Sequence, residues 1–140
     1  MLLSVNVVNL RRGWGGGVGV YISTGCTVSK RVDLEVNGVE CIWLEMLFPY
    51  SKSFLIVLFT DHQTRQDITQ KDFEAQFESA LSTVASENKE IILTGDVNCN
   101  YLVNSDHKEI KSIINSYGLK QLLTTPTGIT TETKTLIDII

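Results

Sequence analysis

The run from Phe54 to Phe59 is apolar without interruption, and it constrains the fold more than any other feature of this chain. A strand with one face in water alternates apolar and polar residues, whereas an unbroken apolar run is typical of a strand covered on both faces. Such a strand needs other elements packed on each side of it. The run therefore predicts a layered domain with a buried sheet and outer helices.

Turn signals divide the sequence before this run into short strand segments. The segments that favour a strand are 3–10, 18–22, 26–36 and 40–48. The glycine cluster at 13–17 predicts a turn, and Asn37-Gly38 is a dipeptide favoured in hairpin turns. The 40–48 segment alternates two sets of side chains, with Cys41, Trp43 and Glu45 on one face and Ile42, Leu44 and Met46 on the other.

A capping residue and an apolar stripe predict a helix after residue 69. Thr69 suits the N-cap, and Asp72 three residues later is close to a capping box. Five apolar residues then recur at helical spacing: Phe73, Phe77, Ala80, Leu81 and Val84. The sequence therefore predicts an amphipathic helix with one buried face.

The rest of the chain favours one more helix between short extended segments. This helix is expected to begin near Ser105 as N-cap and to end at Gly118. Its apolar face would carry Ile110, Ile113, Ile114 and Tyr117. The other segments are a short buried strand at 90–94, an extended piece at 119–123, a threonine-rich loop at 126–133 and an apolar strand at 136–140.

Composition and charge limit the class of protein and its partners. Hydrophobic residues make up 43% of the 140 residues, which indicates a globular chain and suits a single domain over 1–140. The formal net charge is -4, so the chain lacks the broad basic surface that drives non-specific binding of nucleic acid. Attraction to DNA would have to be local, or come from a metal or from segments outside this chain.

Cysteine usage and hydropathy predict the cellular compartment of the chain and its relation to membranes. Cys26, Cys41 and Cys99 are odd in number and widely spaced, which supports neither a disulfide framework nor a zinc site. A reducing intracellular compartment, nucleus or cytoplasm, is the simplest interpretation, and secretion is not expected. No apolar stretch approaches the ~18 residues of a membrane span, so no membrane partner is expected.

The chemistry-bearing pattern follows the strand at 90–94. There the chain places Gly95, the carboxylate Asp96 and, two residues later, the carboxamide Asn98. Alternate residues share a face while the chain stays extended, so Asp96 and Asn98 would point the same way. A carboxylate can orient or deprotonate a water, and an amide can donate a hydrogen bond to phosphate. The same letters also suit an Asx turn that closes a strand.

Four segments in order resemble the endonuclease/exonuclease/phosphatase (DNase I-like) family, and most closely the endonuclease domain of non-LTR retrotransposons. Residues 93–98 (Leu-Thr-Gly-Asp-Val-Asn) are similar to the family's Gly-Asp-x-Asn motif. The other three resemble its glycine-rich strand entry (15–22), the stretch after its second helix (118–123 and 126–130) and its Leu-Ile-Asp strand (135–138). Each motif alone is weak, but the four together in this order are specific.

This resemblance implies a fold, a cofactor and a set of roles. The fold would be an α/β (α+β) two-sheet β-sandwich with outer helices, in four layers. The activity would be phosphodiester hydrolysis with Mg²⁺ or Mn²⁺, which in the retrotransposon branch nicks DNA beside a reverse transcriptase domain. Asp96 would position or activate the attacking water, Asn98 would bind phosphate, and Asp138 would orient a catalytic histidine.

The sequence also departs from the family pattern. The family's metal-binding glutamate and its final Ser-Asp-His strand have no counterpart here, so the domain is expected to be truncated at both ends, and no residue is assigned to the metal. The letters Ser105-Asp106-His107 lie at a helix start, and His62 stands where the branch carries Tyr-Arg-Pro-Pro. Neither histidine is expected to be catalytic. Weak or no DNA nicking by the isolated chain is expected.

Two alternative functions stay open at this point. One is hydrolysis of a phosphate monoester or phosphoinositide by the same kind of site. The other is a non-catalytic remnant or interaction module, because a domain without its first and last strands exposes sheet edges that invite pairing with another chain.

Overall fold

The computed structural model describes residues 5–10, 18–23, 25–36, 41–47, 54–59, 69–96, 99–103, 105, 107–136 and 138–139. Their elements, in chain order, are β1 (Val5–Leu10), β2 (Val18–Ser23), β3 (Thr27–Lys30), the 3₁₀ helix η1 (Val32–Leu34), β4 (Cys41–Leu47), β5 (Phe54–Phe59), α1 (Gln70–Ser86), β6 (Glu90–Asp96), α2 (Lys108–Ser116), β7 (Gly128–Ile129), β8 (Lys134–Thr135) and β9 (Asp138–Ile139).

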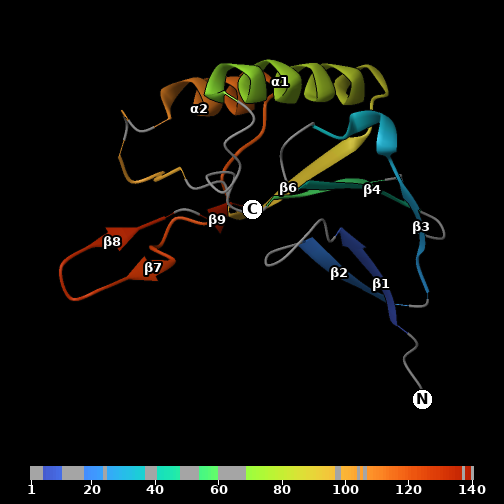
Figure 1. The fold of residues 1–140 in the computed structure, drawn as a ribbon, viewed down its shortest axis with the longest axis horizontal. Coiled ribbons are helices and arrows are strands. Elements are labelled where there is room, and N and C mark those ends of the chain that lie inside the picture. The colour runs from blue at the N-terminus through green and yellow to red at the C-terminus, as the bar shows by residue number, and fades with distance from the viewer. Residues whose placement is uncertain are drawn as a thin grey trace.

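A mixed sheet of five strands in the order β3-β4-β5-β6-β9 forms the centre of the molecule. Strands β5 and β6 are parallel, and α1 crosses over between them, while the other neighbours in this sheet are antiparallel. Two small antiparallel pairs, β1-β2 and β7-β8, form sheets of their own and are not hydrogen-bonded to this sheet as strands. In Figure 1 both helices lie above the sheet, β1-β2 lies below it, and β7-β8 extends to the left. The expected α/β (α+β) class is confirmed.

Strand β4 shows how the layers are held together, because its side chains are buried on both faces. Cys41 and Trp43 belong to a core shared with α1 and α2. Ile42 and Leu44 belong to a second, smaller core with Ile22 of β2. All four β4 residues are at most 1% exposed. The alternation in the sequence therefore predicted this strand correctly.

Helix α1 forms as its sequence predicts. The Thr69 hydroxyl accepts a hydrogen bond from the backbone N–H of Asp72 at 3.2 Å, which satisfies a donor that the first helical turn leaves open. The five residues of the predicted stripe, Phe73, Phe77, Ala80, Leu81 and Val84, are all buried against the sheet. Asn88 with a φ of 52° then turns the chain out of the helix towards β6.

Helix α2 ends where the sequence predicts but begins later. Gly118 has a φ of 72°, and the N–H groups of Gly118 and Leu119 bond back to the carbonyls of Asn115 and Ile114, which is the Schellman arrangement. The predicted start near Ser105 is wrong. The N-cap is His107 with a φ of 44°, and its side chain makes no capping hydrogen bond.

Three other expectations need correction. The segment 26–36 is a strand only over Thr27–Lys30, because the chain then bends into η1, whose Leu34 is buried in the helix-side core. The loop at 126–133 contains β7, which pairs with β8. The last strand, expected over 136–140, is short, Asp138–Ile139. The turns at 13–17 and 37–38 lie outside the described residues.

Strand β6 is longer and less buried than its sequence suggests. It runs on to Asp96, and only Leu93 of its side chains is fully buried. Ile91 and Leu93 face the helices, whereas Ile92 on the other face is 38% exposed. The pair β1-β2 packs beneath β3 and β4 through Ile22, and the described members of this second core include no residue of β6.

Candidate functional site at the end of strand β6

Glycine is required where β6 ends. Gly95 has a φ of 121°, a backbone conformation that residues with a side chain rarely adopt. Directly after it the chain places Asp96, the last residue of the strand. Because β5 and β6 are parallel, their carboxyl ends meet at one edge of the sheet, which is where open α/β sheets commonly bind ligands.

The structure brings two of the three predicted site residues together. Strand β9 runs antiparallel to β6, and its register pairs Asp96 with Asp138 and Gly95 with Ile139. Residues directly opposite each other on antiparallel strands have Cβ atoms about 5 Å apart and share a face. Both aspartates are partly exposed, so solvent reaches the pair. The third residue, Asn98, lies outside the described residues.

Asn100 connects the segment after β6 to the segment before β9. Its side-chain oxygen accepts hydrogen bonds from the backbone N–H of Leu136 at 3.2 Å and of Leu102 at 3.1 Å. Beside it, the N–H of Tyr101 donates to the Leu136 carbonyl at 2.9 Å. These bonds hold the chain two residues after Asn98 against the chain two residues before Asp138. Sequence reasoning missed this role, because a contact over 36 residues leaves no local signal.

A lysine from α2 organises the same segment. The Lys111 ammonium donates to the carbonyls of Asn100 at 2.8 Å and Val103 at 2.6 Å, and it lies 5.2 Å from the centre of the Tyr101 ring. Burial raises the pKa of the Tyr101 hydroxyl, so the ring stays neutral beneath the cation. The loop from β6 is thus fixed to α2 as well as to β9.

Of the letters Ser105-Asp106-His107, the structure describes the serine and the histidine. His107 caps α2, and its Nδ1 lies 3.2 Å from Nε2 of Gln70 at the start of α1. This contact joins the starts of the two helices, a structural role that accounts for the histidine. Ser105 is exposed, and Asp106 lies outside the described residues, as does His62.

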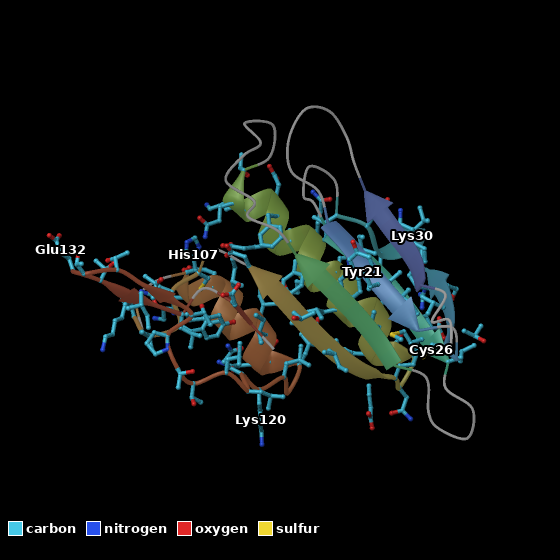
Figure 2. The ribbon with its side chains drawn as sticks, turned by 90° about the horizontal axis from the view of Figure 1, so that it is seen from below. Tyr21, Cys26, Lys30, His107, Lys120 and Glu132 are labelled. Atoms are coloured by element: carbon cyan, nitrogen blue, oxygen red, sulfur yellow. The ribbon has the colours of Figure 1, made fainter. Side chains whose placement is uncertain are left out.

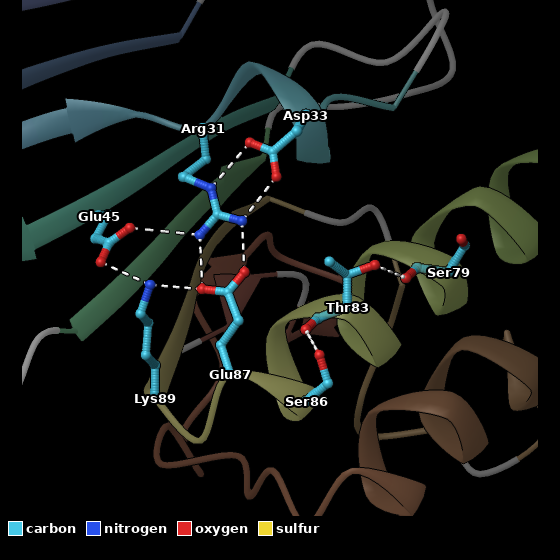
Figure 3. Close-up of polar contacts among 8 residues, drawn as sticks. All are labelled: Arg31, Asp33, Glu45, Ser79, Thr83, Ser86, Glu87 and Lys89. Atoms are coloured by element: carbon cyan, nitrogen blue, oxygen red, sulfur yellow. Dashed lines mark hydrogen bonds and ion pairs between the residues drawn. The ribbon is translucent and has the colours of Figure 1, made fainter.

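Among the described residues, the largest cluster of charged side chains lies elsewhere, and its charges pair with one another (Figure 3). Arg31 pairs through both ends of its guanidinium with Asp33 and Glu87, and more distantly with Glu45 at 3.4 Å. Lys89 bonds to Glu45 and Glu87. Every carboxylate in this cluster has a basic partner, so the cluster ties η1, β4 and the end of α1 together and is a poor candidate for catalysis.

The metal that the resemblance implies can be compared with these side chains. In the part of the chain that the structure describes, no three or more His, Cys, Asp or Glu side chains gather as they would around an ion. Two carboxylates on adjacent strands do fit Mg²⁺, which usually takes one or two protein carboxylates, several waters and a substrate phosphate. Asp96 and Asp138 are therefore the residues that could hold it.

Neither α1 nor α2 combines the length and the apolarity that crossing a membrane would need, as far as the described residues go. Comparison of this chain with family models, with curated proteins and with solved structures gave no match.

Proposed function

We propose that this chain is a metal-dependent phosphodiesterase domain, and that its most fitting activity is nicking of DNA by a retrotransposon-type endonuclease. The observation that carries the proposal is the register that places Asp96 opposite Asp138 at the carboxyl end of β6. The family resemblance had named both residues from motifs that lie about 40 residues apart in the sequence. Their meeting on adjacent strands is what a shared site requires.

The proposed cation would be Mg²⁺ or Mn²⁺, held by Asp96 and Asp138. Two carboxylates that face each other on adjacent strands would supply negative charge and the oxygen ligands that Mg²⁺ prefers. When bound, the ion would supply neutralisation of the phosphate charge and a more acidic bound water. The two-sheet sandwich of the family also belongs to this proposal, with β1-β2 as the part of its second sheet that packs on β4.

The side chains of this chain would divide the remaining work. Asp96 would orient the attacking water and accept its proton, and Asn98 would donate a hydrogen bond to a phosphate oxygen. Asp138 would also orient a catalytic histidine, the role that the resemblance implies. Asn100 would act as a positioning residue, because it fixes the segment that follows Asn98 to the segment that precedes Asp138.

DNA is the preferred substrate over a small phosphate ester because of the order of the motifs. The Pro-Thr-Gly-Ile-Thr and Leu-Ile-Asp segments are similar to the retrotransposon branch rather than to the phosphatases. With a net charge of -4 the chain itself offers little general attraction for DNA. A reverse transcriptase domain is the partner that we expect to supply it.

The proposal is tested with supercoiled plasmid under a molar excess of the chain, with Mg²⁺ or with a chelator. Binding of a labelled oligonucleotide is followed in parallel by fluorescence anisotropy. The variants are Asp96→Asn and Asp138→Asn. Glu90→Gln is the matched control, because Glu90 is an exposed acid at the other end of the same strand. Phosphorylated sugars and inositol phosphates serve as the competing substrates.

Slow nicking that needs Mg²⁺ and is lost in both aspartate variants, but not in the control, would support the endonuclease. If the oligonucleotide bound only with metal, and both aspartate variants lost this binding without any nicking by the parent, the result would support the site. The chain would then be a catalytically inactive domain. Nicking that survives Asp96→Asn, or the absence of both nicking and metal-dependent binding, would overturn the proposal. If the chain hydrolysed a phosphate monoester faster than it nicked DNA, the proposed activity would change to that of the phosphatase branch.

A further inference from the structure

Strand β9 carries one of the two aspartates proposed to hold the cation, but it is only two residues long, Asp138–Ile139. It is joined to β6 at two pairs, Asp96 with Asp138 and Gly95 with Ile139. A slip of one residue in the register of a strand turns its side chains to the other face of the sheet. Such a slip would move the Asp138 carboxylate away from Asp96, so the register of β9 decides whether the two side chains can share an ion.

A side chain from outside the sheet holds this strand at Asp138 itself. The Gln121 carboxamide donates a hydrogen bond from Nε2 to the backbone carbonyl of Asp138 at 3.1 Å. The bond is partly buried, and Gln121 lines the same cavity as the apolar side chains of Ile91, Leu93 and Leu119. Where less water competes, a hydrogen bond is stronger than at the open surface.

The segment that carries Gln121 is itself fixed where it begins. Gly118, with a φ of 72°, ends α2, and Leu119 packs against the helix-side core while its N–H bonds to the Ile114 carbonyl. Two residues later Gln121 reaches β9. The hydrogen bonds at Leu136 hold the chain just before β9 to the segment after β6, and Gln121 holds β9 to the segment after α2.

We infer that Gln121 is a positioning residue for the cation, because its bond fixes the register of β9 and so keeps the Asp138 carboxylate opposite Asp96. The inference rests on the proposed function, since it gives Gln121 a task at the site where these two aspartates would hold Mg²⁺ or Mn²⁺. Gln121 acts through the backbone of Asp138 and not as a ligand. Coupling of this kind is reciprocal, so an ion between the aspartates would in turn stabilise the Gln121 bond.

The test compares Gln121→Met with the parent, using the full 140-residue chain. Methionine keeps the length and the apolar stem of glutamine but has no N–H group to donate. Lys120→Met is the matched control, because it makes the same replacement one residue earlier, at an exposed side chain that extends away from the body of the molecule in Figure 2. Urea unfolding sets conditions under which every variant is fully folded, so a loss of global stability alone does not change the two measurements.

The measurements are the affinity for Mn²⁺, followed by electron paramagnetic resonance of the free ion, and amide exchange without metal, followed by NMR. Of two successive pairs on antiparallel strands, one exchanges its N–H···O bonds, so an amide of Asp138 or Ile139 reports the ladder with β6. For Gln121→Met we expect Mn²⁺ binding about fivefold weaker and exchange of this amide about fivefold faster, the effect of one ordinary hydrogen bond. Lys120→Met should leave both close to the parent.

An affinity for Mn²⁺ in Gln121→Met equal to that of the parent would overturn the inference, even if its global stability fell. Unchanged exchange at both Asp138 and Ile139, or equal effects of Lys120→Met, would overturn it as well. The proposed function fails by a different result. If the parent bound no Mn²⁺, or if Asp96→Asn and Asp138→Asn bound it as tightly as the parent, the cation site would be refuted and the inference with it.

Discussion

At the scale of single residues, the ion cluster around Arg31 is the strongest electrostatic feature of the described structure. Glu87, just past the end of α1, receives two hydrogen bonds from Arg31 and one from Lys89. These bonds, the Arg31 ones first, lower the pKa of Glu87 from 4.5 to about 2. A carboxylate that loses protons more readily in the folded state stabilises the fold wherever it is ionised.

The pH dependence of stability follows from this shift. The contribution of Glu87 is complete above pH 4.5 and is lost as the pH falls towards 2, because the unfolded chain takes up the proton first. The Glu87 side chain is 26% exposed, so solvent screening limits the loss to roughly 1–2 kcal/mol. We expect Glu87→Gln to be less stable than the parent at pH 7, and most of this difference to be lost at pH 2.5. Urea unfolding at both pH values measures this difference.

Glu132→Gln is the control for this experiment, because Glu132 is exposed at the tip of the β7-β8 pair (Figure 2). Its stability should follow that of the parent at each pH. A difference between Glu87→Gln and the parent that is the same at pH 7 and at pH 2.5 would mean that the cluster contributes packing rather than ionisation.

At the scale of elements, the sequence predicted those helices and strands whose capping residues and apolar pattern lie within the element itself. Helix α1 has its cap and its apolar stripe within its own residues, and both are found in the structure. The N-cap of helix α2 is His107, two residues after the predicted Ser105, and His107 takes a left-handed conformation and contacts Gln70 at the start of α1. The strand expected over 26–36 is short because Leu34 is drawn into the helix-side core. Distant contacts decided both differences.

The same division applies to the candidate site. Motifs identified Asp96 and Asp138, which are the last residue of β6 and the first residue of β9. Their pairing required the register of β9 on β6, which no single segment contains. Asn100 and Lys111 were missed, since each acts through backbone groups of segments far along the chain. These two residues give the loop its shape without belonging to any recognisable motif.

Lys111 provides the prediction for this scale. Lys111→Met keeps the length and the apolar stem of the side chain but removes both hydrogen bonds to the loop carbonyls. Hydrogen bonds that involve a charged group contribute about 1.5–3 kcal/mol each, net of the bonds to water that they replace. We expect a loss of about 1–3 kcal/mol in stability and faster amide exchange at Tyr101 and Val103, whose segment it holds. Hydrogen exchange followed by NMR measures both.

Lys108→Met is the matched control, because Lys108 is an exposed lysine one turn earlier in the same helix. It should leave exchange in the loop unchanged. If the two variants behaved alike, the effect of Lys111 would be one of helix charge and not of loop attachment. If the loop amides of Lys111→Met exchanged at the same rate as in the parent, the hydrogen bonds to the Asn100 side chain would be enough to hold the loop in place.

At the scale of the whole molecule, two cores of unequal size share β4. The helix-side core joins β4 and β6 to α1 and α2, and it contains the stacked rings of Phe73 and Phe77, whose centres are 5.7 Å apart. Among the side chains that the structure describes, the core on the other face has Ile22, Ile42 and Leu44 as buried members. Ile22 is the buried side chain described in the pair β1-β2. Since buried apolar area is the main source of stability, we predict that this pair opens more readily than the rest.

This difference predicts separate responses to truncation in the two cores. Phe77→Ala should cost about 3–5 kcal/mol, because it leaves a cavity in the larger core and weakens every element around it. Ile22→Ala should raise amide exchange in β1 and β2 while the amides of α1 keep their protection. Native-state hydrogen exchange at low denaturant resolves the two patterns. A uniform rise in exchange with Ile22→Ala would mean that β1-β2 unfolds together with the central sheet, and that the layers on both faces of β4 form one cooperative unit.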